Sequence, residues 1–111
     1  MIKYTNFLPY KPLSDEIPYD AVIMKIASFT TFEEVKYNQR LPFRAWQTLQ
    51  SLIQKEAIQW AIKNSYGGLY HKFILKKLPD NFATLCEVEL YVHVNEEIRT
   101  YAILKYDYQI A

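Results

Sequence analysis

The alternation of side chains between Phe82 and Val94 constrains the fold more than any other feature of this chain. One set of alternating positions is apolar or small, and it comprises Thr84, Cys86, Val88, Leu90, Val92 and Val94. The positions between them are mostly polar, namely Leu85, Glu87, Glu89, Tyr91 and His93. Because successive side chains of a strand point to opposite faces of a sheet, this period of two predicts a strand over about 82–94 with one face on a core.

The preceding segment, about 69–78, alternates in the same way and predicts an antiparallel partner strand. Its more apolar face is formed by Leu69, His71, Phe73 and Leu75. A two-residue turn at Asp80-Asn81 would place Phe73 opposite Val88 on the apolar face. This register keeps both apolar faces on the same side of the sheet.

The residues that follow the first of these strands predict a third one, over about 98–109. Asn95-Glu96-Glu97 would form a three-residue hairpin loop. Closing the hairpin there pairs Val94 with Ile98, Val92 with Thr100, Leu90 with Ala102, and Val88 with Leu104. A register shifted by one residue would place core positions against Arg99 and Lys105, so the pattern itself selects this pairing.

This three-stranded meander brings aromatic and charged side chains together on its outer, solvent-facing side. Tyr70, Tyr91 and Tyr101 form one row, and Lys72, Glu89 and Ile103 form the next. Ten of the 111 residues are tyrosine, which is enriched at protein interfaces because it is both apolar and hydrogen-bonding. The row either stabilises the sheet by cross-strand contacts or binds a partner, and both interpretations stay open. The predicted partner-binding residues are Tyr70, Tyr91, Tyr101, Lys72, Glu89, Arg99 and Ile103.

A long helix is predicted over about 42–64, in the middle of the chain. Proline suits its first turn, and Ser65-Tyr66-Gly67-Gly68 supplies a stop at which a glycine can adopt a left-handed cap. The stripe that should cover the sheet comprises Ala45, Trp46, Leu49, Leu52, Ile53, Ala57 and Trp60. Ile58 and Ile62 lie off this stripe, where either the N-terminal segment packs over them or they contribute to an interface.

The N-terminal third predicts two strands, Ile2 to Leu8 and Ala21 to Phe29, joined by a proline-rich connection. Thr31-Phe32-Glu33-Glu34 has the spacing of a capping box and predicts a short helix that ends near Asn38. The fold class is therefore α+β in a single domain, 1–111. It consists of one long helix (about 42–64) plus a short helix packed on a mostly antiparallel sheet, ending in a three-stranded meander (about 69–78, 82–94, 98–109).

Composition and missing motifs exclude several functional classes. The chain has 13 basic and 12 acidic residues, and this balance disfavours a dedicated duplex-DNA binder. We expect no signal peptide and no membrane association, because no apolar run has the required length or position. A lone Cys86 suits a reducing compartment, so we expect a cytoplasmic protein. Neither a glycine-rich phosphate loop nor metal-ligand spacing is present, and no cofactor or metal is expected.

The residues that come closest to a catalytic acid–base pair are His71 and His93, which have charged side chains nearby. A metal-independent ribonuclease uses residues of these types. In the predicted register, however, His71 faces inward and His93 outward. Two catalytic histidines would have to converge on one phosphate. We therefore expect no catalytic residue, and the sequence favours a non-enzymatic protein while an enzymatic function stays open as an alternative.

Three functional hypotheses follow. The first is a small non-enzymatic interaction module, inhibitor- or immunity-like, that binds another protein through the tyrosine-rich outer face. The second is a single-stranded nucleic-acid binder on the same face, with phosphates met by Lys72, Arg99, Lys76 and Lys105. Glu87 and Glu89 disfavour it by repulsion.

The third is a small-molecule or enzymatic cavity between helix and sheet, lined by Trp46, Trp60, His71 and Tyr106. An unprotected edge of the last strand would also allow a homodimer.

Overall fold

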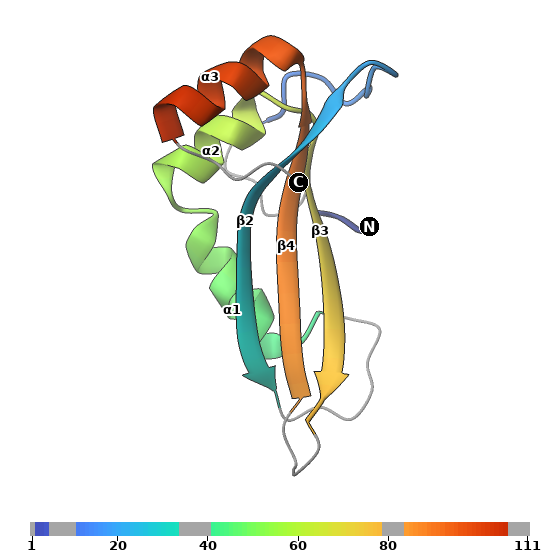
Figure 1. The fold of residues 1–111 in the computed structure, drawn as a ribbon, viewed down its shortest axis with the longest axis vertical. Helices are drawn as coiled ribbons and strands as arrows, with labels where there is room; N and C mark the ends of the chain where they lie inside the picture. The colour runs from blue at the N-terminus through green and yellow to red at the C-terminus, as the bar shows by residue number, and fades with distance from the viewer. Residues whose placement is uncertain (1, 5–10, 34–40, 79–83, 107–111) are drawn as a thin grey trace.

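The computed structural model of the chain describes residues 2–4, 11–33, 41–78 and 84–106. Its elements are β1 (Ile2–Tyr4), β2 (Val22–Glu33), α1 (Phe43–Leu52), α2 (Glu56–Lys63), β3 (Tyr66–Lys77), β4 (Thr84–Val94) and α3 (Glu96–Tyr106). The four strands form one antiparallel sheet in the order β1-β3-β4-β2. All three helices gather on one side of the long strands (Figure 1), so the predicted α+β class is confirmed.

β4 lies between β3 and β2, and it has one buried and one partly exposed face, as predicted. Its residues alternate strictly between buried and partly exposed along the whole strand. The register with β3 is also as predicted, since Phe73 lies opposite Val88 and Lys72 opposite Glu89. The alternation of polar and apolar residues is therefore sufficient to define this pair of strands. The predicted turn at Asp80-Asn81 lies outside the described residues.

The prediction of a third meander strand over 98–109 is wrong. Its place beside β4 is taken by β2, which pairs along its whole length from Val22 opposite Val94 to Glu33 opposite Thr84. The described part of the predicted third strand instead forms α3. Strand pairing between distant segments has thus replaced the short hairpin.

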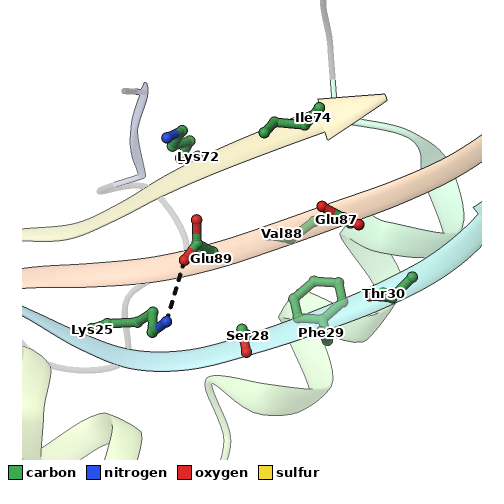
Figure 2. Close-up of a pocket in the computed structure, with 9 residues that line it drawn as sticks. All are labelled: Lys25, Ser28, Phe29, Thr30, Lys72, Ile74, Glu87, Val88 and Glu89. Carbon is green, nitrogen blue, oxygen red and sulfur yellow. Dashed lines mark hydrogen bonds and ion pairs between the residues drawn. The ribbon is translucent and has the colours of Figure 1, made fainter. Parts of the chain in front are cut away.

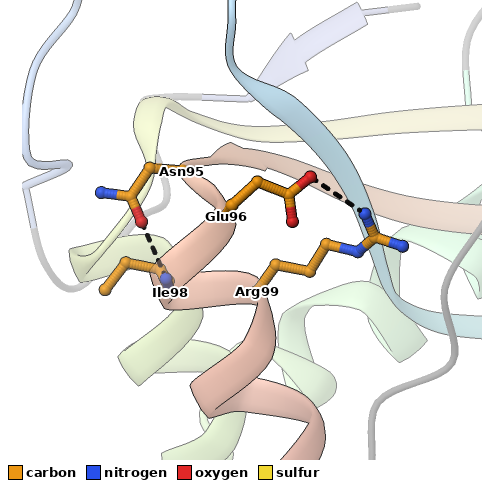
Figure 3. A network of polar contacts seen from close by, with 4 residues as sticks. All are labelled: Asn95, Glu96, Ile98 and Arg99. Carbon is orange, nitrogen blue, oxygen red and sulfur yellow. Dashed lines mark hydrogen bonds and ion pairs between the residues drawn. The ribbon is translucent and has the colours of Figure 1, made fainter.

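The residues around Asn95 explain why a helix forms there. The Asn95 side-chain oxygen accepts a hydrogen bond from the backbone N–H of Ile98 at 2.7 Å, which is the geometry of a helix N-cap (Figure 3). Glu96 and Glu97 lie in the first turn, where negative charge stabilises the helix dipole. Arg99 pairs with Glu96 at 3.4 Å on the same turn. The presumed hairpin loop is therefore a helix start.

β2 extends beyond its predicted end and runs through Glu33. The predicted short helix from Thr31 is therefore wrong for residues 31–33, and its remainder to Asn38 lies outside the described residues. The Glu33 side chain instead accepts a hydrogen bond from the backbone N–H of Ala45 at 2.8 Å. It thereby caps α1, whose own N-cap residue, Pro42, has no side-chain hydrogen bond to offer.

The predicted long helix is divided into α1 and α2, because Lys55 adopts an extended conformation between them. The break rotates the apolar stripe of the second half. Ile58 and Ile62 are consequently buried, with exposed fractions of 4% and 0%, and Trp60 is only partly buried. The prediction that the isoleucine pair lies off the core is wrong. The core between helices and sheet includes Met24, Ala45, Leu49, Ile53, Ile62, Leu69, Val88, Leu90, Val92 and Ala102.

The expected glycine conformation is present at Gly67 and Gly68, with φ of 75° and 84°. The two residues belong to the start of β3, however, and α2 ends at Lys63, with Asn64 as its C-cap residue. The N-terminal connection runs alongside, since Ser14 forms a bridge with Tyr66. Of the predicted strand from Ile2 to Leu8, the described residues are those of β1. Among the described helices, none has the length and apolar character needed to cross a membrane.

Candidate binding surface on the open face of the sheet

The side of the sheet that faces away from the helices forms a continuous surface, which we call the outer face. Because residues directly opposite each other in an antiparallel pair share a face, the ladder identifies its members. They are Tyr70, Lys72, Ile74 and Lys76 of β3, Leu85, Glu87, Glu89, Tyr91 and His93 of β4, and Ile23, Lys25, Ser28, Thr30 and Phe32 of β2. Within the described part of the chain, no helix covers this surface.

β2 contributes to the outer face through a change of register. A bulge between Lys25 and Ala27 lets Lys25 lie opposite Tyr91 and Ser28 opposite Glu89. The inserted residue shifts the alternation by one, so both side chains point outward. The bulge also explains why sequence analysis missed these residues, since it interrupts the period of two.

The middle of the outer face is hollowed, with a volume of about 350 Å³ (Figure 2). It is lined by Lys25, Ser28, Phe29, Thr30, Lys72, Ile74, Glu87, Val88 and Glu89. Phe29 and Val88 lie behind the strands, whereas the polar side chains and Ile74 form the rim and the floor. The hollow is therefore largely polar, with one exposed aliphatic side chain at its side.

On the outer face, each strand carries charged side chains of one sign. β4 supplies two acidic residues in the middle, and the flanking strands supply lysines. Lys25 of β2 lies 3.4 Å from Glu89, and Lys76 of β3 lies 3.1 Å from Glu87. Ion pairs near the surface contribute only about 0–1 kcal/mol each. These groups can therefore exchange their partners for charges on another molecule at little cost.

Tyr70 and Tyr91 lie directly opposite each other, as predicted. The Tyr70 ring meets the His93 ring edge-to-face, with centroids 4.9 Å apart. Burial raises the pKa of Tyr70, and burial together with the neighbouring Glu89 raises the pKa of Tyr91. Both hydroxyls are thus protonated at neutral pH and can donate hydrogen bonds.

The remaining predicted binding residues lie elsewhere. Tyr101, Arg99 and Ile103 belong to α3, on the helical side of the sheet, because the third strand of the meander does not form. The Tyr101 ring packs against Trp60 at 5.5 Å between centroids. Of the seven predicted residues, the structure brings together Tyr70, Tyr91, Lys72 and Glu89.

The two histidines lie on opposite faces, as the alternation predicts. His71 is buried on the helical side and stacks on Phe73 with 5.9 Å between centroids, whereas His93 is on the outer face. They do not converge on one site. The described residues contain no group of three or more His, Cys, Asp or Glu side chains that could hold a metal.

Cys86 is fully buried beside the capping carboxyl group of Glu33. Burial and the nearby negative charge raise the pKa of its thiol to about 11. A thiol is nucleophilic only as the thiolate, so this cysteine is unreactive at neutral pH.

Two residues of the proposed helix–sheet cavity pack against each other. The rings of Trp60 and Tyr106 are 5.3 Å apart, and Lys105 lies 5.1 Å above the Tyr106 ring. Together with Tyr101, they form an aromatic cluster between α2 and α3. Leu90, on the sheet beneath the helices, is fully buried.

Comparison with known proteins gives no assignment. No protein-family model matches the sequence, and neither a curated protein nor a solved structure is significantly similar to it. A function for this chain must therefore be argued from its own surfaces.

Proposed function

We propose that this protein is a small non-enzymatic interaction module that binds another protein through its outer face. The observation that carries the proposal is the outer face itself, which is broad, uncovered by the described helices, and hollowed around charges of both signs. An inhibitor- or immunity-like role in the cytoplasm is part of the proposal. A buried, unreactive thiol at Cys86 is compatible with a reducing compartment.

The composition of the outer face supports a protein partner. Ile74 and Ile23 are each 45% exposed and flank the charged centre. Tyr91 provides a rigid aromatic side chain with a hydrogen-bonding tip, as residues that dominate binding energy commonly do. Apolar anchors surrounded by exchangeable charges are typical of interfaces between proteins.

The same charges disfavour a nucleic acid. Glu87 and Glu89 occupy the middle of the face, where they would repel phosphates. Two of the cations that would have contacted a nucleic acid, Arg99 and Lys105, belong to α3 on the helical side. A protein with mixed charge can pair with both the lysines and the glutamates.

The experiment that tests this proposal is an affinity capture from lysate of the native host, with wild type and two alanine variants as bait. Tyr91→Ala removes an aromatic side chain from the outer face, and we expect it to weaken partner binding by about 2 kcal/mol or more. That loss corresponds to a roughly 30-fold lower affinity.

Tyr101→Ala is the matched control, because it removes the same side chain from the helical side of the molecule. We expect it to retain the partner. Equal retention by folded Tyr91→Ala and Tyr101→Ala would show that the outer-face tyrosine is structural. Capture of RNA that is lost on treatment with ribonuclease would instead favour the nucleic-acid hypothesis.

A further inference from the structure

A second interaction surface lies at the edge of the sheet. In the strand order, β2 is a terminal strand that pairs with β4 over its whole length. On its other side, no strand of the described chain pairs with it. The free backbone N–H and C=O groups of such an edge can pair with another strand.

Natural edge strands are commonly protected by lysines, prolines or bulges. In β2, the only lysine and the bulge both lie at or before Ala27. The segment that follows, Ser28 to Phe32, has no charge, proline or glycine. Phe32 is 57% exposed, and the next residue, Glu33, is turned into the core, where it caps α1. Within its own sequence, this five-residue edge therefore carries none of these three protections, and no described strand pairs with it.

We propose that the occupant of this edge is a second copy of the same chain, paired antiparallel about a twofold axis at Thr30. Thr30 is the midpoint between Ala27, where the bulge ends, and Glu33, where the strand ends. Centring the pair there gives the longest regular ladder that avoids the bulge. The directly opposed residues would be Thr30 with Thr30, Ser28 with Phe32, and Phe29 with Thr31.

In this register the two copies match each other in two respects, namely the sheet face on which opposed side chains lie and the absence of like charges. Ser28, Thr30 and Phe32 share the outer face, and Phe29 and Thr31 share the helical side. Each pair therefore places side chains on the same face, as an antiparallel ladder requires. No charged side chain enters the pairing. The exposed Phe32 ring of one copy would cover Ser28 of the other and lose contact with water.

One existing contact lies at the end of this edge. The Arg44 guanidinium donates a long hydrogen bond, 3.4 Å, to the Phe32 carbonyl. A carbonyl oxygen has two lone pairs, so this bond is compatible with an additional strand. Because Ser28 and Thr30 also line the hollow, the two hollows of the dimer would adjoin across the twofold axis.

The test is the mass of the protein in solution, measured by sedimentation across a concentration series. We expect wild type to approach twice the chain mass of 13.2 kDa. Thr30→Lys would place two like charges directly opposite each other at the axis, and we expect it to be monomeric. In the monomer the new lysine would face Glu87 on β4, so the variant should fold. Leu104→Lys, at an 82% exposed position of α3, should leave the dimer intact.

Disulfide trapping tests the register. Thr30→Cys should cross-link to its own copy, because opposed residues lie about 5 Å apart between Cα atoms. Ser28→Cys alone should not, since the two copies of residue 28 would be roughly 14 Å apart. A mixture of Ser28→Cys with Phe32→Cys should cross-link. The buried thiol of Cys86 does not compete.

Three outcomes would overturn the proposal: a monomeric wild type at every concentration, a dimer that survives Thr30→Lys, or Ser28→Cys cross-linking as efficiently as Thr30→Cys. None of them bears on capture of a partner by the outer face, since Tyr91 does not belong to the edge strand.

Discussion

At the scale of single residues, Glu33 connects the sheet to the helical layer. Its carboxyl oxygen is within 2.8 Å of the Ala45 N–H and 3.3 Å of the Thr31 hydroxyl, and the side chain is 4% exposed. A buried acceptor of this kind satisfies a helix N–H that would otherwise lack a partner. Glu33 is thus a structural carboxyl group at the end of β2.

We expect Glu33→Ala to lower the free energy of unfolding by about 1–3 kcal/mol, because it leaves the Ala45 N–H buried without its acceptor. Urea denaturation followed by circular dichroism measures the change. Glu33→Gln keeps an acceptor oxygen and nearly the same volume, so it should cost clearly less. Equal losses in the two variants would contradict the capping role.

His93 gives the fold a dependence on pH. Burial lowers the pKa of His93 below its ordinary value of 6.5. As the pH falls through 6.5, the unfolded chain therefore binds a proton that the native protein resists, and stability declines until the pH reaches the lowered native pKa. We expect this decline to be shallower in His93→Gln. Thermal unfolding at several pH values compares the two slopes, and parallel slopes would exclude His93 as the source.

At the scale of elements, the start of β3 depends on a close approach to the N-terminal connection. Gly67 has φ of 75°, and its N–H donates to the Ser14 carbonyl. A Cβ atom at this position would lie 2.7 Å from the Tyr70 hydroxyl and 3.1 Å from the Ile17 side chain. Both the backbone conformation and the available space therefore require glycine here.

Gly67→Ala should consequently destabilise the protein by about 1–3 kcal/mol, as a left-handed conformation alone costs an L-residue roughly 1–2 kcal/mol. Chemical denaturation gives the value. In a Tyr70→Phe background the nearest clashing atom is absent, so the same substitution should cost less. A loss of the same size in both backgrounds would show that the clash with Tyr70 contributes nothing.

The elements also show what could be predicted from sequence. The pairing of β3 with β4 could be predicted because β4 alternates along its whole length and the register irregularity of β3, between Tyr66 and Tyr70, lies at the start of that strand. The sequence of residues 98–106 fits either a strand or a helix. The apolar residues Ile98 and Ala102 are four positions apart, and this spacing places them on the same face in both structures. The Asn95 cap decides between them. Alternation alone does not identify which distant segment will pair with β4.

At the scale of the whole molecule, the three described helices lie on one side of the sheet, and none of them covers the outer face (Figure 1). Half of this candidate surface, on β3 and β4, followed from the sequence. The β2 half did not, because the bulge at Lys25 shifts its alternation and its pairing partner lies some sixty residues away. For the same reason, the residues of α3 were wrongly placed on it.

The most direct test of the central claim, that the outer face binds a partner, is photo-cross-linking in the native host. A photo-reactive amino acid replaces Ile74 on the outer face or, as the control, Leu104 on α3; the two positions are 45% and 82% exposed. We expect one discrete protein adduct from position 74 and none of that species from position 104. An adduct that forms from position 104 but not from position 74 would contradict this account and move the binding surface to the helical side.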